Sequence, residues 1–184
     1  MKQESTVKYI LRLTVTLLLI CAFVALALAG VNAITKDRIA AVKAEKTQKA
    51  IAAVLPVVVH VHEVEFTDAS GIVTKVYEAQ GVGHAVEVAP NGFGGAITMM
   101  VGVVDGKVTG ISIISHAETP GLGAVAAANG DKGAAFRDQF IGLRGGITIG
   151  GGDNQIDSLS GATISSQAIV DGVNAAVACV AGLD

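Results

Sequence analysis

Cysteine is scarce in this sequence, and its placement excludes a cluster site. The chain has only two cysteines, Cys21 inside an apolar stretch and Cys179 near the C-terminus. No CxxC pair is present to ligate zinc or an iron–sulfur cluster, and these two residues do not build a disulfide framework. We therefore interpret both as small hydrophobic side chains.

Aromatic residues and runs of like charge are also lacking. Phe, Trp and Tyr together make up 4% of the chain, and Trp is absent. A site that holds a flat ring must therefore use aliphatic side chains, backbone or one of the few Phe and Tyr residues. The formal net charge is −3, and no stretch combines clustered Lys and Arg with aromatics. The sequence thus predicts no nucleic-acid partner.

Several motifs that carry chemistry are missing as well. The glycine-rich run at 92–97 lacks the Lys and the Ser or Thr of a phosphate-binding loop. No GxGxxG follows a strand, so a Rossmann site is unsupported. No GxSxG is present, which disfavours a hydrolase but leaves open a base supplied from elsewhere in the fold.

Two histidines are spaced as metal ligands sometimes are. His60 and His62 are expected on one face of a strand, but a metal site would need a third ligand from elsewhere. We predict a solvated strand face there. The sequence predicts no metal site and no catalytic residue.

A long apolar run occupies the N-terminal region. From Leu13 to Thr35 no residue is charged, and as a helix this run is about 34 Å long, enough to cross the hydrocarbon core of a membrane. A core helix with no polar face does not suit so small a protein. A cleaved signal peptide stays an alternative, since Ala25-Leu26-Ala27 resembles a cleavage site. We predict a retained single-pass anchor, with residues 1–35 forming a cytoplasmic tip and the membrane helix.

The pattern then changes twice. Residues 36–56 mix Lys, Glu, Gln and Ala, which predicts a helical stalk in solvent that ends near Pro56. Residues 57–184 form the predicted soluble domain. The fold class is therefore α+β: a transmembrane helix followed by one domain with an antiparallel sheet flanked by helices.

Short segments rich in Val and Ile predict the strands of that sheet. They lie at 57–66, 72–79, 84–88, 96–104 and 107–115. Asp105-Gly106 predicts a hairpin between the last two. A helix is expected at 133–141, where Phe136 and Phe140 are four residues apart, and 145–152 is expected to be a strand or a loop.

The run from Asp157 to Ser166 is the most informative stretch. Apolar residues from Gln167 to Ala181 recur at helical spacing, so Thr163 and the serines after it stand where a helix begins. Such a position suits an anion, because the first backbone N–H groups of a helix are unpaired and its dipole is positive there. The alternative is a simple helix cap made by Ser and Thr.

Two other runs accompany it. Residues 116–123 contain Pro120-Gly121, which favours a turn. Residues 92–97 form a glycine loop that leads into a strand. Taken singly, each is an ordinary connection.

Together the three runs resemble the FMN-binding subunits of the Rnf and Nqr electron-transfer complexes. The family pattern of Asp, two residues, Ser or Thr, Gly, Ala and Thr is met by residues 157–163, Glu-Thr-Pro-Gly-Leu-Gly by 118–123, and Gly-aromatic-Gly-Gly by 92–95. The resemblance covers nearly the whole chain and implies that Thr163 carries FMN through a phosphoester bond. The residues it implies around the cofactor are Glu118, Thr119, Gly121, Leu122, Gly123, Ser160, Gly161, Ala162, Ser165, Gly94 and Gly95.

The resemblance also implies a function. A flavoprotein subunit with covalent FMN would relay electrons in an ion-translocating ferredoxin:NAD+ oxidoreductase of the Rnf type, without complete catalytic activity alone. The partners would be integral membrane subunits, one bearing a second flavin, as well as membrane lipid and a flavin transferase. The helix would lie in the inner membrane with the FMN domain on the outer, periplasmic side.

Three alternatives stay open. They are the equivalent Nqr subunit, another membrane flavin relay, and a non-enzymatic anchored binding domain in which Thr163 only caps a helix. His116 before the Glu-Thr-Pro-Gly run makes the chain more similar to the Rnf type than to the Nqr type.

Overall fold

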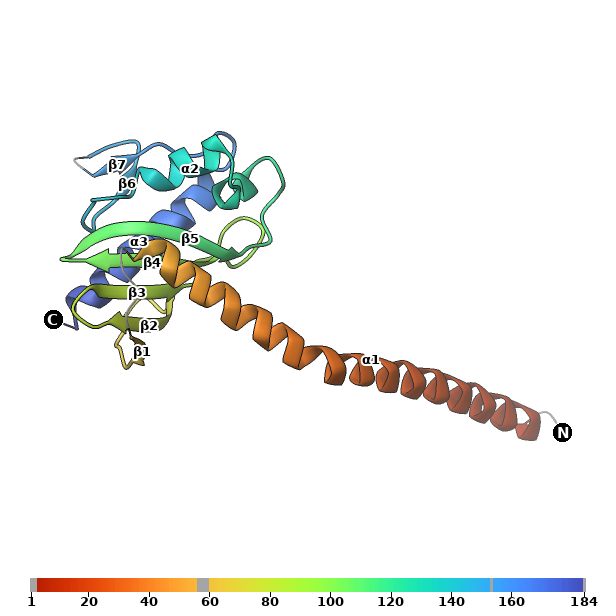
Figure 1. Cartoon of the computed structure of the whole chain (residues 1–184). Helices are drawn as coiled ribbons and strands as arrows, with labels where there is room; N and C mark the ends of the chain where they lie inside the picture. Colours follow the sequence, from red (N-terminus) through yellow and green to blue (C-terminus); the bar gives the residue numbers. More distant parts are fainter. Residues whose placement is uncertain (1–2, 56–59, 153, 184) are drawn as a thin grey trace. The chain divides into compact units, whose positions relative to one another are not determined.

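A long helix and a compact α+β domain make up the protein. The computed structural model describes residues 3–55, 60–152 and 154–183. Helix α1 (Gln3–Val54) comes first, and seven strands, the 3-10 helix η1 and helices α2 and α3 follow in the described residues (Figure 1). The chain divides into two compact units between Glu45 and Lys46.

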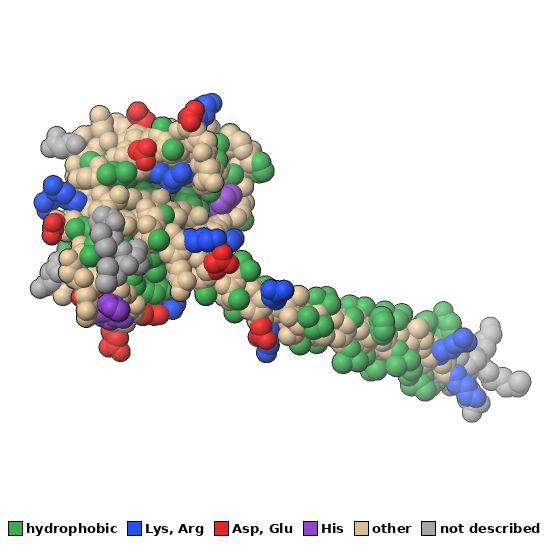
Figure 2. Space-filling model, in the orientation of Figure 1, with side chains coloured by type: hydrophobic (Ala, Val, Ile, Leu, Met, Phe, Trp, Pro, Cys, Tyr) green, Lys and Arg blue, Asp and Glu red, His purple; other side chains and the backbone are tan. Residues whose placement is uncertain are grey.

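The N-terminal unit contains a candidate membrane-spanning helix. An 18-residue window of α1 reaches a mean hydropathy of 2.6, and none of that window is buried. Figure 2 shows hydrophobic side chains along this part of the helix, and Leu17, Phe23 and Leu26 are among its exposed residues. An apolar helix without protein cover suits lipid. Helix α3 (Thr163–Ala181) passes the same length test, but 61% of its window is buried, which makes it a core helix.

Five strands form one antiparallel sheet in the order β1-β2-β3-β4-β5. Their bounds are β1 Val61–Val64, β2 Val73–Ala79, β3 Gly83–Val88, β4 Thr98–Val104 and β5 Lys107–Ser115. The predicted α+β class and antiparallel sheet are confirmed. The first strand is much shorter than the predicted 57–66, of which 57–59 lie outside the described residues.

The hairpin between β4 and β5 forms where it was predicted. Asp105 and Gly106 have positive φ values of 51° and 68°, which suits a two-residue hairpin because its backbone twist matches that of the strands. The pairing of Val104 with Lys107 sets the register beside the turn.

The remaining elements differ from prediction mainly at their ends. Helix α2 (Asp131–Asp138) begins and ends earlier than 133–141, although the rings of Phe136 and Phe140 do meet edge to face with centroids 5.6 Å apart. The segment at 145–152 contributes β6 (Thr148–Ile149), which pairs in parallel with β7 (Gln155–Ile156). Helix η1 (Gly123–Ala127) follows the 116–123 run.

Helix α3 packs on one face of the sheet and forms the main core with it (Figure 1). Ile169, Val173 and Ala176 are fully buried there with Val86 and Val101 of the sheet. The approach is close at Gly172, where an added Cβ would lie 2.9 Å from Pro90 Cγ. Burial of Cys179 raises the pKa of its thiol, which agrees with its interpretation as a small hydrophobic residue.

The end of α1 packs on the sheet's other face. Ala50, Ile51, Val54 and Leu55 are buried in a second cluster with Ala79, Ala85 and Met100. Residues 46–54 thus belong to the compact domain, whereas the predicted stalk placed them in solvent and began the domain at residue 57. The prediction missed this because the apolar positions of 36–56 are too few to indicate a buried face from sequence alone.

Two glycines of the sheet allow the last turn of α1 to approach it closely. Gly102 on β4 and Gly110 on β5 are cross-strand partners. A Cβ on Gly102 would collide with the carbonyl oxygen of Val54, whereas a Cβ on Gly110 would lie 3.5 Å from Val54 Cα, in ordinary contact. Thr109 Oγ1 also donates a hydrogen bond to that carbonyl at 2.5 Å.

We expect Gly102→Ala to lower the free energy of unfolding by about 1–3 kcal/mol, because backbone atoms cannot move aside as a flexible side chain can. The measurement is thermal or urea unfolding of the full chain in detergent. Gly110→Ala is the matched control and should change stability little. Equal stability of the two variants would contradict a close backbone contact at Gly102.

Candidate functional site

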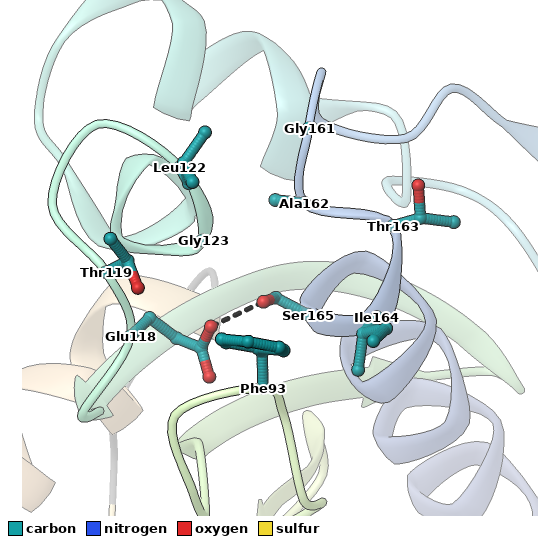
Figure 3. Close-up of a pocket in the computed structure, with 10 residues that line it drawn as sticks. All are labelled: Phe93, Glu118, Thr119, Leu122, Gly123, Gly161, Ala162, Thr163, Ile164 and Ser165. Carbon is teal, nitrogen blue, oxygen red and sulfur yellow. Dashed lines mark hydrogen bonds between the residues drawn. The ribbon is translucent and has the colours of Figure 1, made fainter.

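A cavity of about 350 Å³ lies where three loop segments meet at the N-terminal end of α3. The segments are the glycine loop around Phe93, the turn from Glu118 to Gly123, and residues 161–165 (Figure 3). Its lining consists of Phe93, Glu118, Thr119, Leu122, Gly123, Gly161, Ala162, Thr163, Ile164 and Ser165. Three runs that are far apart in the sequence therefore form one site.

Helix α3 begins at Thr163, at the edge of this cavity. Gly161, with φ of 73°, turns the chain into the helix, and the first helical hydrogen bond runs from Ser166 N–H to Ala162 O at 2.9 Å. The N–H groups of residues 163–165 therefore have no partner within the helix. Thr163 is exposed, and Figure 3 shows its hydroxyl on the side away from Glu118.

The alternative of a simple helix cap is wrong. The N-cap residue is Ala162, and no side chain accepts a hydrogen bond from the first turn. Ser166 Oγ instead donates to Ala162 O at 2.9 Å and accepts from Leu159 N–H at 3.0 Å. This buried hydroxyl holds the turn at 159–162, so the first-turn N–H groups remain available.

A buried carboxylate joins the three segments. Glu118 Oε1 accepts a hydrogen bond from Gly94 N–H at 2.9 Å. Its Oε2 accepts a hydrogen bond from Ser165 Oγ. Both Glu118 and Ser165 are buried, so Ser165 binds a protein carboxylate and is not directed at solvent as an anion donor would be.

The Pro120-Gly121 turn forms the wall opposite Thr163. Gly121 has φ of 79°, as the predicted turn requires. Leu122 N–H and Ala124 N–H donate to Thr119 O at 3.2 and 3.3 Å, and the Leu122 side chain stays 43% exposed. A Cβ added to Gly161 would lie 3.1 Å from Leu122 Cδ2, so the two walls are close there.

Most of the predicted site residues come together, but some do not line the cavity. Eight do so: Glu118, Thr119, Leu122, Gly123, Gly161, Ala162, Thr163 and Ser165. Gly121, Ser160, Gly94 and Gly95 are not among the lining residues, although Gly94 contributes its N–H to Glu118.

Two lining residues were missing from the predicted set. Phe93 and Ile164 are 72% and 60% exposed, and both face the cavity (Figure 3). The signal for Phe93 was present in the sequence, because it is the aromatic residue of the 92–95 run. Ile164 gave no signal, since an exposed apolar residue in a first helical turn has no pattern of its own.

The two histidines do not share a strand face. His60 precedes β1 and has φ of 42°, while His62 lies within the strand, 3.5 Å from Glu78 Oε2. The prediction failed because the strand begins only at Val61. Within the described residues no group of three His, Cys, Asp or Glu side chains is placed to hold a metal ion.

The cavity has the parts that a flavin nucleotide needs. Phe93, Leu122 and Ile164 offer apolar surface for a flat ring, and the first turn of α3 offers unpaired N–H groups for a phosphate. Residues 92–178 match the family model of the FMN-binding domain. The protein is thus an FMN-binding domain preceded by a candidate membrane-spanning helix.

Comparison with whole chains gives the family. Residues 1–54 match the family model of the RnfG N-terminal region. The chain is 33% identical to the G subunit of an ion-translocating oxidoreductase complex from Methanosarcina acetivorans, covering 92% of this chain and 94% of the relative. It is 29% identical to the G subunit of the Na(+)-translocating ferredoxin:NAD(+) oxidoreductase complex from Acetobacterium woodii, covering 92% and 91%. The chain belongs to the family of G subunits of ion-translocating oxidoreductase complexes.

We expect Ser166→Ala to lower the free energy of unfolding by about 1–3 kcal/mol, because it leaves the Leu159 N–H without its acceptor. Chemical unfolding of the full chain in detergent measures this. Ser160→Ala, at an exposed serine of the same run, is the control and should stay within about 0.5 kcal/mol. The same loss in both variants would argue against a specific role of the Ser166 hydroxyl.

Proposed function

We propose that this chain is the membrane-anchored flavoprotein subunit that relays electrons in an ion-translocating ferredoxin:NAD+ oxidoreductase of the Rnf type. The match of the N-terminal region to the RnfG model favours this type over the Nqr subunit. The chain is a subunit of the oxidoreductase and holds one cofactor. It does not complete the reaction alone.

The FMN is attached through its phosphate to the hydroxyl of Thr163. The observation that carries this proposal is the position of Thr163, an exposed hydroxyl at the first residue of α3 beside unpaired N–H groups. A phosphate diester keeps one negative charge, which the positive end of the helix dipole stabilises. Attachment there also prevents loss of the cofactor from a cavity open to solvent.

The chain's own residues bind and orient the cofactor. The first-turn N–H groups of α3 hold the phosphate, and Leu122 and Phe93 provide apolar contacts for the ring. The Thr119 hydroxyl lies on the cavity wall and is available to hydrogen-bond a polar group of the cofactor. When bound, FMN supplies the redox chemistry, while the protein sets its position and electrostatics.

Thr163→Val should abolish covalent flavin, because the variant keeps the side-chain shape but has no hydroxyl to esterify. The full chain is co-expressed with a flavin transferase, and intact mass and in-gel fluorescence are measured. Thr163→Ser should keep the added mass of FMN. Thr119→Val, on the opposite wall, is the matched control and should also keep it. Covalent flavin on Thr163→Val would refute this attachment site.

The attachment and the location of the domain imply specific partners. A flavin transferase that uses FAD attaches the FMN, and integral membrane subunits, one with a second flavin, exchange electrons with this one. α1 anchors the chain in the lipid of the inner membrane, with the FMN domain on the outer, periplasmic side.

The side of the membrane can be tested in sealed vesicles. In right-side-out vesicles, protease added outside should digest the FMN domain and leave a protected fragment that contains α1. Inverted vesicles should protect the domain until detergent is added. Immunoblotting for the C-terminus measures digestion of the domain, and immunoblotting for the N-terminus detects the protected fragment. Digestion of the domain only in inverted vesicles would place it in the cytoplasm.

A further inference from the structure

Glu118 is distinctive because it is a buried acid to which the described residues supply no ion-pair partner. The residue is 6% exposed and belongs to the lining of the cavity. Neither ion pair described among residues 60–152 involves it, and its two hydrogen bonds come from the neutral donors Gly94 N–H and Ser165 Oγ.

The surrounding backbone leaves room for this carboxylate and for little else. A Cβ on Gly92 would collide with Glu118 Oε1, and a Cβ on Gly123 would collide with Oε2. Glycines thus close around both oxygens. Within this cradle the carboxylate cannot turn toward a cation elsewhere in the protein, because its hydrogen bonds and neighbouring backbone hold it in place.

We propose that Glu118 is a potential-setting residue: its fixed negative charge lowers the midpoint potential of the flavin in this cavity. The proposal rests on the FMN function above and concerns the same cavity. Reduction of a flavin adds two electrons, with one or two protons taken from water. When only one proton accompanies them, the ring gains a net negative charge. A nearby fixed negative charge opposes that gain and so makes the flavin harder to reduce.

The cavity then holds charges of both signs. The positive end of the α3 dipole is available to the phosphate, and the carboxylate of Glu118, bound to Ser165 in the same first turn, adds a negative charge to the lining (Figure 3). This arrangement holds the cofactor tightly at its phosphate and biases its ring toward the oxidised form. A relay with a low potential can accept electrons only from a strong reductant and pass them on readily.

The test is a redox titration of the full-length, flavin-loaded chain in detergent. Dithionite is the reductant, and dyes of known potential serve as references. Glu118→Gln keeps the size of the side chain and an acceptor for Gly94 N–H but removes the charge. The equilibrium with the dye should shift toward reduced flavin on the order of tenfold, as expected for unit charges about 10 Å apart at an effective dielectric constant of about 20.

A control outside the cavity and a second neutral variant separate charge from shape. Glu65→Gln removes an exposed carboxylate outside the cavity lining and should stay within about twofold of the wild type. Glu118→Met, neutral and of similar volume, is a second charge-removing variant and should shift as Glu118→Gln does.

The outcomes are distinct. No shift in Glu118→Gln, or an equal shift in Glu65→Gln, would overturn the proposal. Loss of flavin from both neutral variants would also overturn it, because Glu118 would then serve to retain the cofactor and not to set its potential. A wild-type chain that takes up no flavin in the presence of the transferase would refute the proposed function itself.

Discussion

The packing of α3 on the sheet is the contact on which the rest of the domain depends. This helix buries nearly all of its inward face against β2, β3 and β4, and Gly172 brings it close enough to touch Met99 and Pro90. Because the helix is held along its length, the position of its first turn is held as well. Thr163 and Ser165 therefore meet the 92–95 loop and the 118–123 turn at a fixed place.

In that first turn, the two neighbouring serines make hydrogen bonds to different parts of the protein. Ser166 holds the turn before the helix, and Ser165 binds the carboxylate of Glu118. Neither serine caps the helix, so the N–H groups beside Thr163 stay available for a phosphate. A hydroxyl-rich run before a helix is thus compatible with an anion site because its hydroxyls are already used elsewhere.

The other face of the sheet explains why the compact domain does not begin where the helix ends. The last turn of α1 is buried against Met100 and lies close to Gly102, so the compact unit begins within the helix. The same helix has no charged residue from Leu13 to Thr35. One continuous helix therefore has two environments, and the composition of each part matches its own surroundings.

Sequence alone determined the features that depend on local pattern. The candidate membrane helix follows from an uncharged run long enough for a bilayer, the β4–β5 hairpin from Asp105-Gly106, and the turn before η1 from Pro120-Gly121, because chain length and backbone preference act within a few residues. The family motifs also predicted most of the residues that line the cavity. Tertiary structure decided the burial of the end of α1, the roles of Ser165 and Ser166, and the burial of Glu118 between Gly94 and Ser165. These depend on atoms that approach from distant segments, and a carboxylate, a hydroxyl or a small apolar stripe has no sequence pattern that tells which neighbours will surround it.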